Sequence, residues 1–348
     1  MRIKLDSQAG GRRLIYAVVS LVVLAALAGG AAYAWIGRHV PIQDDAAPER
    51  VVIATIVYAG SCPVIAAQAK GYFTSEGIQA AIPAYTSGKA SLDAVLAGQA
   101  DLGLVADLPV MFAVMDHRPL SVVATVAKTE NDHGIVGRKD RGVTSPANLQ
   151  GKRIGVAVGT SAHFVLDVLL TRYQLSARDV IVRDLKPEAL SRALAMDEID
   201  VASTWEPNLG KLQSQLGGNG TTFVIGDIYK MSTNLVGTQA YVASHEKTLE
   251  KVLRAMMHGA RFCEESPNEA RELVAASVKV DAADLKASWS DNRFHVTLDQ
   301  SLLLELEDET RWAVKNRLTG RADMPNYLGH LHLDTLQAVA PAAVTVIH

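Results

Sequence analysis

The chain has 348 residues and a formal net charge of −3, and 49% of its residues are apolar while 20% are charged. This length predicts two domains or lobes, and the composition is that of a globular protein with a sizeable core, which excludes an intrinsically disordered chain. The body of the sequence has no run of Lys or Arg, which argues against a nucleic-acid partner. Its two cysteines are too few for a zinc cage and make no disulfide framework.

The first predicted element is a hydrophobic helix over residues 14–36, a stretch of 23 residues without a charge. A helix of about 20 apolar residues spans a bilayer. Arg2, Lys4, Arg12 and Arg13 precede the stretch. Because basic flanks remain in the cytoplasm, the body of the chain is expected outside the inner membrane, held by an N-terminal transmembrane anchor.

A cleaved signal peptide is the alternative for the same segment. Ala32-Tyr33-Ala34 has the small-x-small pattern of a signal-peptidase site, so cleavage near Ala34 would release the body. Both alternatives place the body in the periplasm, and no cysteine follows closely enough to carry a lipid. Residues 1–49 are therefore interpreted as a cytoplasmic tip, a transmembrane or signal segment and a linker.

After the linker, short β-branched runs alternate with helical patterns, as in parallel βαβ units. Strands are predicted at residues 51–57, 78–85 and 102–105, with helices at 64–72 and 89–97. The same order returns with strands at 153–158, 180–185 and 199–203 and helices at 163–173 and 188–195. Residues 96–109 also resemble residues 194–207. This internal repeat predicts an α/β protein with two similar lobes.

From about residue 240 the pattern is mostly helical. Helices are predicted at residues 245–265, 268–277 and 302–318, an edge strand at 343–347 and a surface loop at 217–220. His330 and His332 have the spacing of a metal pair, but no further ligands accompany them, so surface or packing histidines are favoured. We expect no metal site.

Three predicted βα turns carry small hydroxyl residues where a helix begins: Ser61, Ser87 followed by Gly88, and Thr160 followed by Ser161. Helix N-termini offer free N–H groups and a partial positive charge. Ligands of parallel sheets bind beyond the carboxyl ends of the strands. The turns therefore predict one crevice that suits an oxyanion, and the alternative is that each hydroxyl only caps its helix.

Other candidate ligand contacts lie at the ends of predicted strands. Trp205 is interpreted as a pocket wall, with a core tryptophan as the alternative. Asp107 and Glu206 close corresponding strands of the two repeats, where they would hold an ammonium group, so a zwitterion such as an aminosulfonate is predicted. The alternative is that both carboxylates turn away. Cys62 and His163 are further candidates at helix starts, with packed side chains as the alternative.

Catalytic signatures are missing from the sequence. It contains no G-x-S-x-G, H-E-x-x-H, P-loop or G-x-G-x-x-G motif. Without these motifs, we expect neither a catalytic site nor a cofactor.

Several motifs between residues 50 and 348 match one family. They are Ala69-Lys70-Gly71-Tyr72-Phe73 with Glu76-Gly77-Ile78, Ser87-Gly88, Asn148-Leu149-x-Gly151-Lys152-Arg153, Gly159-Thr160-Ser161, Trp205-Glu206-Pro207 and Met324-Pro325-Asn326-Tyr327-Leu328. On these motifs the chain resembles the periplasmic solute-binding proteins of ABC importers for nitrate, alkanesulfonates and taurine. That family shares its fold with thiamine-pyrimidine precursor proteins.

The resemblance implies a type II periplasmic-binding fold, in which two α/β lobes with two crossovers close on a ligand. Lobe 1 would comprise residues 50–129 and 236–348, and lobe 2 residues 130–235. The resemblance also implies that helix N-termini hold the ligand's acidic head, and that the partners are a small anionic or zwitterionic ligand and the permease and ATPase subunits of an importer. Two alternatives stay open: an anchored sensory protein, and an enzyme of a thiamine-pyrimidine or menaquinone pathway.

Overall fold

The computed structural model describes residues 47–224 and 229–347. The described residues belong to a compact unit that begins at Pro48. The predicted apolar segment 14–36 and the predicted cleavage site near Ala34 lie outside them. Among the described residues, no helix combines the length and the apolar character that crossing a membrane requires.

The larger of two sheets has seven strands in the order β12-β5-β11-β4-β1-β2, with β3 also paired to β1. β1 pairs in parallel with β2, β3 and β4, whereas β11 is antiparallel to β4 and β5. β4 is buried along its whole length, as expected for a strand covered on both faces. The strands are β1 Glu49–Ile56, β2 Ile78–Ala81, β3 Ala84–Tyr85, β4 Leu102–Ala106, β5 Leu120–Thr129, β11 Met231–Thr238 and β12 Asn292–Arg293.

The smaller sheet has five strands in the order β10-β6-β9-β7-β8. β7 is parallel to β8 and β9, and β6 is antiparallel to β9 and β10. The parallel trio β7, β8 and β9 thus repeats the trio β1, β2 and β4, which confirms the prediction of a repeated α/β arrangement. The strands are β6 His133–Arg138, β7 Arg153–Val156, β8 Ile181–Asp184, β9 Val201–Trp205 and β10 Gly220–Val224.

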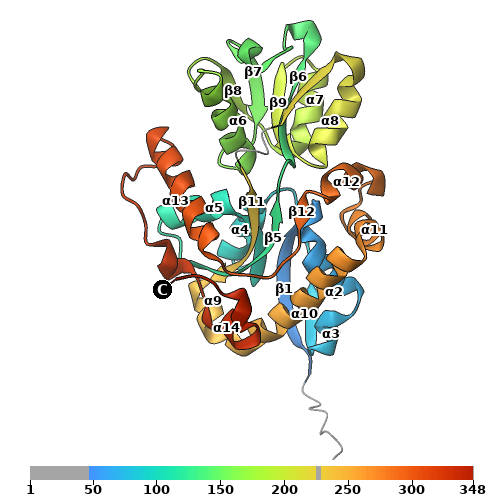
Figure 1. Cartoon of the computed structure of the whole chain (residues 1–348), viewed down its shortest axis with the longest axis vertical. Coiled ribbons are helices and arrows are strands. Elements are labelled where there is room, and N and C mark those ends of the chain that lie inside the picture. The colour runs from blue at the N-terminus through green and yellow to red at the C-terminus, as the bar shows by residue number, and fades with distance from the viewer. Residues whose placement is uncertain (1–46, 225–228, 348) are drawn as a thin grey trace, which may run out of the picture. The chain divides into compact units, whose positions relative to one another are not determined.

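Helices cover the sheets, and Figure 1 shows α10, α13 and α14 of the C-terminal part on the side of the larger sheet. Those before β11 are α2 Cys62–Ala69, α3 Tyr72–Ser75, α4 Gly88–Leu96, α5 Asp107–Met115, α6 Ser161–Arg172, α7 Leu190–Ala195 and α8 Asn208–Leu216. Those after it are α9 Gln239–Ser244, α10 Glu246–Glu265, α11 Pro267–Val278, α12 Ala282–Trp289, α13 Gln300–Lys315 and α14 Asp334–Val339.

The chain passes between the two sheets twice, first from β5 to β6 and then from β10 to β11. Two crossovers are what the resemblance implies. The predicted end of lobe 2 at residue 235 is too late, because β11, Met231–Thr238, already pairs with β4 and β5 of the larger sheet. The strands of the smaller sheet therefore end with β10.

The internal repeat extends to matching contacts in the two sheets. Asp101 directly precedes β4, and its Oδ2 accepts a hydrogen bond of 2.8 Å from the Val52 N–H of β1. Asp200 directly precedes β9, and its Oδ2 accepts one of 2.9 Å from the Arg153 N–H of β7. Each carboxylate therefore joins the starts of two neighbouring parallel strands.

Two predicted segments differ from the structure. Residues 343–347 form no strand: a 3-10 turn at Pro341–Ala343 is followed by an isolated bridge between Leu298 and Val344. The predicted loop at 217–220 is instead a 3-10 turn, Gly217–Asn219, that leads into β10. β10 forms because it completes the edge of the smaller sheet beside β6.

The two cysteines form a disulfide bond between α2 and α10, with the Cα atoms of Cys62 and Cys263 6.2 Å apart. These helices pack closely because Gly259 lies on Pro63: a Cβ at position 259 would come within 2.0 Å of the Pro63 carbonyl oxygen. Cys62 is fully buried and bonded, so its prediction as a ligand contact is wrong. The two cysteines are 201 positions apart in the sequence, so their pairing could not be predicted from local pattern.

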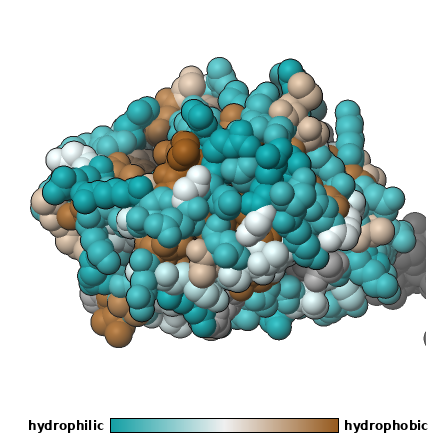
Figure 2. All heavy atoms as spheres, turned by 90° about the horizontal axis from the view of Figure 1, so that it is seen from above, coloured by the Kyte–Doolittle hydropathy of each residue, from teal (hydrophilic) through white to brown (hydrophobic). Residues whose placement is uncertain are grey.

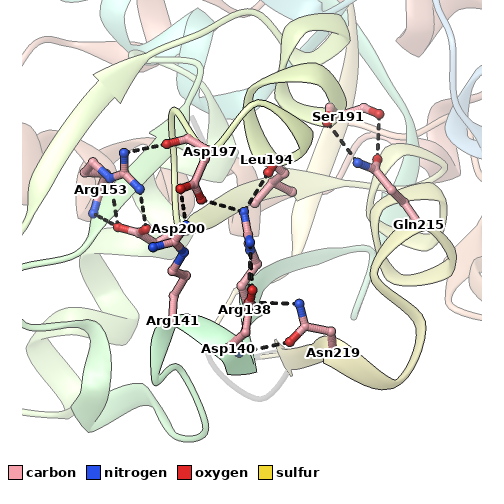
Figure 3. A network of polar contacts seen from close by, with 10 residues as sticks. All are labelled: Arg138, Asp140, Arg141, Arg153, Ser191, Leu194, Asp197, Asp200, Gln215 and Asn219. Carbon is pink, nitrogen blue, oxygen red and sulfur yellow. Dashed lines mark hydrogen bonds and ion pairs between the residues drawn. The ribbon is translucent and has the colours of Figure 1, made fainter.

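Charged side chains are paired at the end of the smaller sheet where β7 and β9 begin. Figure 2 views the molecule from the side of this sheet, and the surface there is largely hydrophilic. Figure 3 shows that Arg153 donates to both carboxylate oxygens of Asp200, at 2.6 and 3.1 Å, and to the Asp197 carbonyl at 2.6 Å. Arg138, the last residue of β6, donates to Asp140 and Asp197. This network fixes the far end of the sheet.

Candidate functional site

A narrow pocket lies at the opposite end of the smaller sheet, between the two sheets. Both lobes contribute to its wall through helix starts and strand ends, as the fold rule for parallel sheets predicts. The larger lobe contributes the lining residues Ile56, Tyr58, Ser87, Gly88, Lys89, Ala106, Pro109 and Met231. The smaller lobe contributes His133, Thr160, Ser161 and Trp205.

Two helix N-termini from different lobes face this pocket. α4 begins at Gly88, and the Ser87 Oγ accepts a hydrogen bond of 3.1 Å from the Ala90 N–H, so Ser87 caps the helix while lining the pocket. Position 88 must be small, because a Cβ there would lie 2.9 Å from the Ala106 nitrogen. This close approach places the start of α4 against β4.

The second N-terminus lacks a side-chain cap. α6 begins at Ser161, and the Thr160 hydroxyl donates to the Ala157 carbonyl at 2.7 Å instead of capping the helix. Thr160 and Ser161 are 5% and 3% exposed and both line the pocket. First-turn N–H groups of an uncapped helix bind anions well, because they carry the positive end of the helix dipole.

Aromatic and imidazole side chains form the rest of the polar wall. His133 begins β6 and pairs across the sheet with Trp205 of β9, and their rings lie 6.0 Å apart. The His133 Nδ1 lies 2.5 Å from the Asp132 Oδ1, which fixes the direction of the imidazole. The Tyr58 hydroxyl is buried and has no hydrogen-bond partner among the described residues.

Burial raises the pKa of Tyr58 well above its ordinary value, and the nearby charges of Asp132 and Asp107 raise it further. Tyr58 therefore keeps its proton and is available as a donor. Tyr58 is one of the residues that line the pocket.

The two predicted ammonium-binding carboxylates do not line the pocket. Asp107 is fully buried and accepts hydrogen bonds from the Tyr229 hydroxyl at 2.5 Å and the Ser232 N–H at 2.9 Å. Burial raises the pKa of Asp107, and these hydrogen bonds oppose that shift. Glu206 accepts a hydrogen bond of 3.0 Å from the Gly210 N–H at the start of α8, and burial raises its pKa. Both carboxylates serve the fold, as the alternative predicted.

Three other predicted residues lie elsewhere. The Ser61 hydroxyl donates to the Ile56 carbonyl at 2.7 Å and closes the β1–α2 turn. Cys62 is bonded to Cys263. His163 lines a neighbouring pocket that shares Lys89 with the first, and burial lowers the pKa of its imidazole. The structure thus brings together Ser87, Gly88, Thr160, Ser161 and Trp205, but not Ser61, Cys62, Asp107, His163 or Glu206.

The described residues contain no group of three or more His, Cys, Asp or Glu that could hold a metal ion. His330 follows the packing alternative, because its Nδ1 lies 3.0 Å from the Leu120 carbonyl oxygen. Sequence reasoning missed Tyr58, Lys89 and His133 as pocket residues. A signal existed for Tyr58 and Lys89, which directly follow the predicted strand 51–57 and the Ser87-Gly88 turn.

Two α/β lobes joined by two crossovers, with a pocket between them at two helix starts, define the class of two-lobed solute-binding folds. The family model described as NMT1/THI5 like matches residues 59–270. The chain belongs to this family, which confirms the resemblance found in its motifs.

Named relatives and solved structures agree with this class. A Brucella abortus sequence described as a binding protein is 24% identical over 283 residues, covering 80% of this chain and 85% of the relative. The taurine-binding periplasmic protein of Escherichia coli is 27% identical over 166 residues, covering 47% and 51%. The structure of the alkanesulfonate-binding protein SsuA from Xanthomonas axonopodis pv. citri has a TM-score of 0.71 at 19% identity, covering 82% of this chain and 99% of that one. At this low identity, the similarity to the SsuA structure shows that the two proteins share a fold.

Proposed function

We propose that this protein is the extracytoplasmic binding component of an ABC importer and captures a small organic or inorganic oxyanion between its lobes. The observation that carries the proposal is the pair of helix N-termini, at Gly88 and Ser161, that face one pocket from opposite lobes. No Asp or Glu side chain of the described residues lines that pocket, whereas Lys89 and His133 do. The site therefore offers donors to a negative head group.

The energetics of such a site are sufficient without an arginine clamp. A hydrogen bond to a charged group contributes about 1.5–3 kcal/mol. Micromolar affinity needs about −8 kcal/mol. Four charge-assisted bonds, offset by the cost of ordering the ligand, reach that range. Ser161, Tyr58 and the first-turn N–H groups of α6 and α4 lie at the pocket that would use them.

The orientation of Asp107 and Glu206 refines the ligand class. Both carboxylates are engaged by backbone N–H groups outside the wall of the first pocket, so an ammonium group finds no carboxylate there, although Asp93 and Asp116 line the neighbouring pocket. The preferred ligand is a plain oxyanion, such as nitrate or an alkanesulfonate, rather than the zwitterion predicted from the sequence. The neighbouring pocket that shares Lys89 and Pro109 gives room for an organic body.

Export follows from the N-terminal segment, which acts as an inner-membrane anchor or as a signal peptide cleaved near Ala34. The Cys62–Cys263 bond supports an oxidising compartment, since disulfides persist in the periplasm and are rare in the cytosol. The family's likeness to importer subunits supports a permease and an ATPase as partners. An anchored sensory protein with the same pocket is the second candidate, because the charged N-terminal flank and apolar segment 14–36 suit a membrane-held receptor.

An enzyme of the same fold is less well supported. A relative named 4-amino-5-hydroxymethyl-2-methylpyrimidine phosphate synthase, from Uromyces fabae, is 30% identical, but the match covers only 34% of this chain. Both cysteines are joined in the disulfide bond, so neither offers a free thiol as a nucleophile.

A thermal-shift screen with nitrate, ethanesulfonate, taurine and bicarbonate, followed by calorimetry, tests the proposal. We expect saturable binding of at least one plain oxyanion and a weaker response to taurine than to ethanesulfonate. Stronger binding of taurine than of ethanesulfonate would indicate that a carboxylate binds the ammonium group of the ligand. No response to any oxyanion would contradict the proposed function.

A further inference from the structure

We propose that Trp312 of the C-terminal helix α13 and Asp167 of α6 form a latch that joins the two lobes outside the ligand pocket. α13 belongs with the larger lobe, where the Trp312 ring meets Phe112 of α5 edge-on at 6.3 Å. α6 belongs with the smaller lobe, where it packs on β6 and β9. Figure 1 shows α13 beside α5, with α6 above them. Trp312 therefore contacts both lobes.

The contacts to the smaller lobe combine a hydrogen bond with ring packing. The Trp312 Nε1 donates to the Asp167 Oδ2 at 2.7 Å. The Trp312 ring also meets Phe164 edge-on at 5.0 Å and His163 edge-on at 5.7 Å. Edge-on aromatic pairs at these separations are attractive beyond the apolar area that they bury.

Because Asp167 is buried, the cost of breaking its hydrogen bond to Trp312 opposes the separation of the two lobes. Asp167 is 7% exposed. A buried carboxylate that loses a donor carries a desolvation cost, so separating α6 from α13 is opposed until water replaces the indole N–H. The Phe164 ring also lies 5.0 Å from the ring of Tyr229, which lies in the second crossover just before β11 and is hydrogen-bonded to Asp107. Through Phe164, the latch therefore also contacts the connection between β10 and β11, one of the two segments that join the lobes.

The latch acts on the ligand pocket through α6. Asp167 lies six residues after Ser161, so about 9 Å of rigid helix separates the latch from the N-terminus that faces the pocket. Trp312 itself is not part of the pocket wall. It is a positioning residue that holds the start of α6 opposite the start of α4 whether or not a ligand is present.

Spin-label distance measurements on the full-length protein test this proposal without a ligand. Labels are placed at Met196→Cys in the smaller lobe and Lys247→Cys in the larger, where the side chains are exposed. The bonded Cys62 and Cys263 do not take label. We compare the parent with Trp312→Phe, which keeps a ring but removes the N–H, and with Asp167→Asn. Trp289→Phe, a tryptophan packed on Phe294 within the larger lobe, is the matched control.

The expected result is one dominant distance in the ligand-free parent and in the Trp289→Phe control. In Trp312→Phe the ratio of open to closed molecules should rise about tenfold, the effect of losing one hydrogen bond to a charged group. Asp167→Asn keeps an acceptor oxygen and should shift the ratio less. A distribution in Trp312→Phe identical to the control overturns the latch, as does a parent that is already open. Circular dichroism confirms that each variant is folded.

Discussion

The two ends of the smaller sheet use their polar groups in opposite ways. At the far end, where β7 and β9 begin, Arg153 and Asp200 satisfy each other (Figure 3). At the pocket end, Thr160 and Ser161 lie at a pocket that no Asp or Glu of the described residues lines, although His133, which also lines it, is paired with Asp132. One end therefore stabilises the lobe, and the other keeps donors available for a ligand.

This separation has a physical basis. Charged side chains that are paired with each other are not available to bind a ligand. Helix N-termini, in contrast, present N–H groups in fixed positions that have no oppositely charged side chain beside them. β9 shows both roles within one strand, with Asp200 directly before it and Trp205 at its end. If the comparison is correct, substitutions at the two ends should separate stability from affinity.

The largest effect is expected from breaking the far end with Asp200→Ala. Its carboxylate accepts from the Arg153 N–H and from two guanidinium nitrogens, so the variant should lose about 2–3 kcal/mol of unfolding free energy. Urea unfolding gives this value, and the affinity for ethanesulfonate should stay within about twofold. Glu307→Ala, which removes an exposed pair with Arg311, is the control and should cost less than about 0.5 kcal/mol.

A smaller effect of the opposite kind is expected at the pocket end. Ser161→Ala removes a donor from the α6 start and should weaken ethanesulfonate binding about tenfold, or about 1.4 kcal/mol. Calorimetry measures this loss. Ser203→Ala is the matched control, because the Ser203 hydroxyl donates to the Ala162 carbonyl inside the same lobe at 2.8 Å. It should lower stability but leave affinity unchanged, and equal affinity losses in both variants would refute the assignment.

The pH dependence of stability sharpens the comparison further. The hydrogen bond from Arg153 lowers the pKa of Asp200. A carboxyl whose pKa is depressed by folding stabilises fully above its unfolded value near 3.9, and this stabilisation disappears as the pH falls through the lower folded value. The gap in unfolding free energy between the parent and Asp200→Asn should therefore be largest near neutral pH and shrink below about pH 4. A gap that is constant with pH would mean that the charge of Asp200 is not the cause.

The smallest expected effect concerns Asp107, which lies behind the pocket. Because its oxygens are engaged by Tyr229 and Ser232, Asp107→Asn should leave the ratio of ethanesulfonate to taurine affinity unchanged. Competitive calorimetry on the folded variant measures this ratio. A change of more than about threefold would show that the Asp107 carboxylate senses the ligand's ammonium group.

Much of the fold was predictable because parallel βαβ units alternate visibly along the chain. The strands at 51–57 and 153–158 were predicted near β1 and β7 from their apolar runs. β5, β6 and β11 escaped prediction because they lie around the crossovers, where antiparallel pairing replaces the strand–helix rhythm. The place of β5 and β11 depends on partners more than a hundred residues away, as in the hydrogen bond from the Thr125 hydroxyl to the Asn234 side chain.

The site was predictable only where local chemistry determines it. Ser87, Thr160 and Ser161 face the pocket because a βα turn directs the start of a helix there. The direction of the Asp107 side chain was not predictable, since Ser232, 125 residues later, supplies a backbone partner that turns it inward. His133 enters the pocket only because β6 pairs with β9 and brings it opposite Trp205.

The central claim is that the pocket recognises the negative charge of an oxyanion. Calorimetric titration of the full-length protein with ethanesulfonate and with ethyl methyl sulfone, a neutral sulfone of nearly the same shape, tests it most directly. The account predicts that the sulfonate binds at one site per chain and at least about a hundredfold more tightly than the sulfone, since two or more charge-assisted hydrogen bonds are lost with the charge. Equal affinity for the two compounds, or binding of neither, would contradict it.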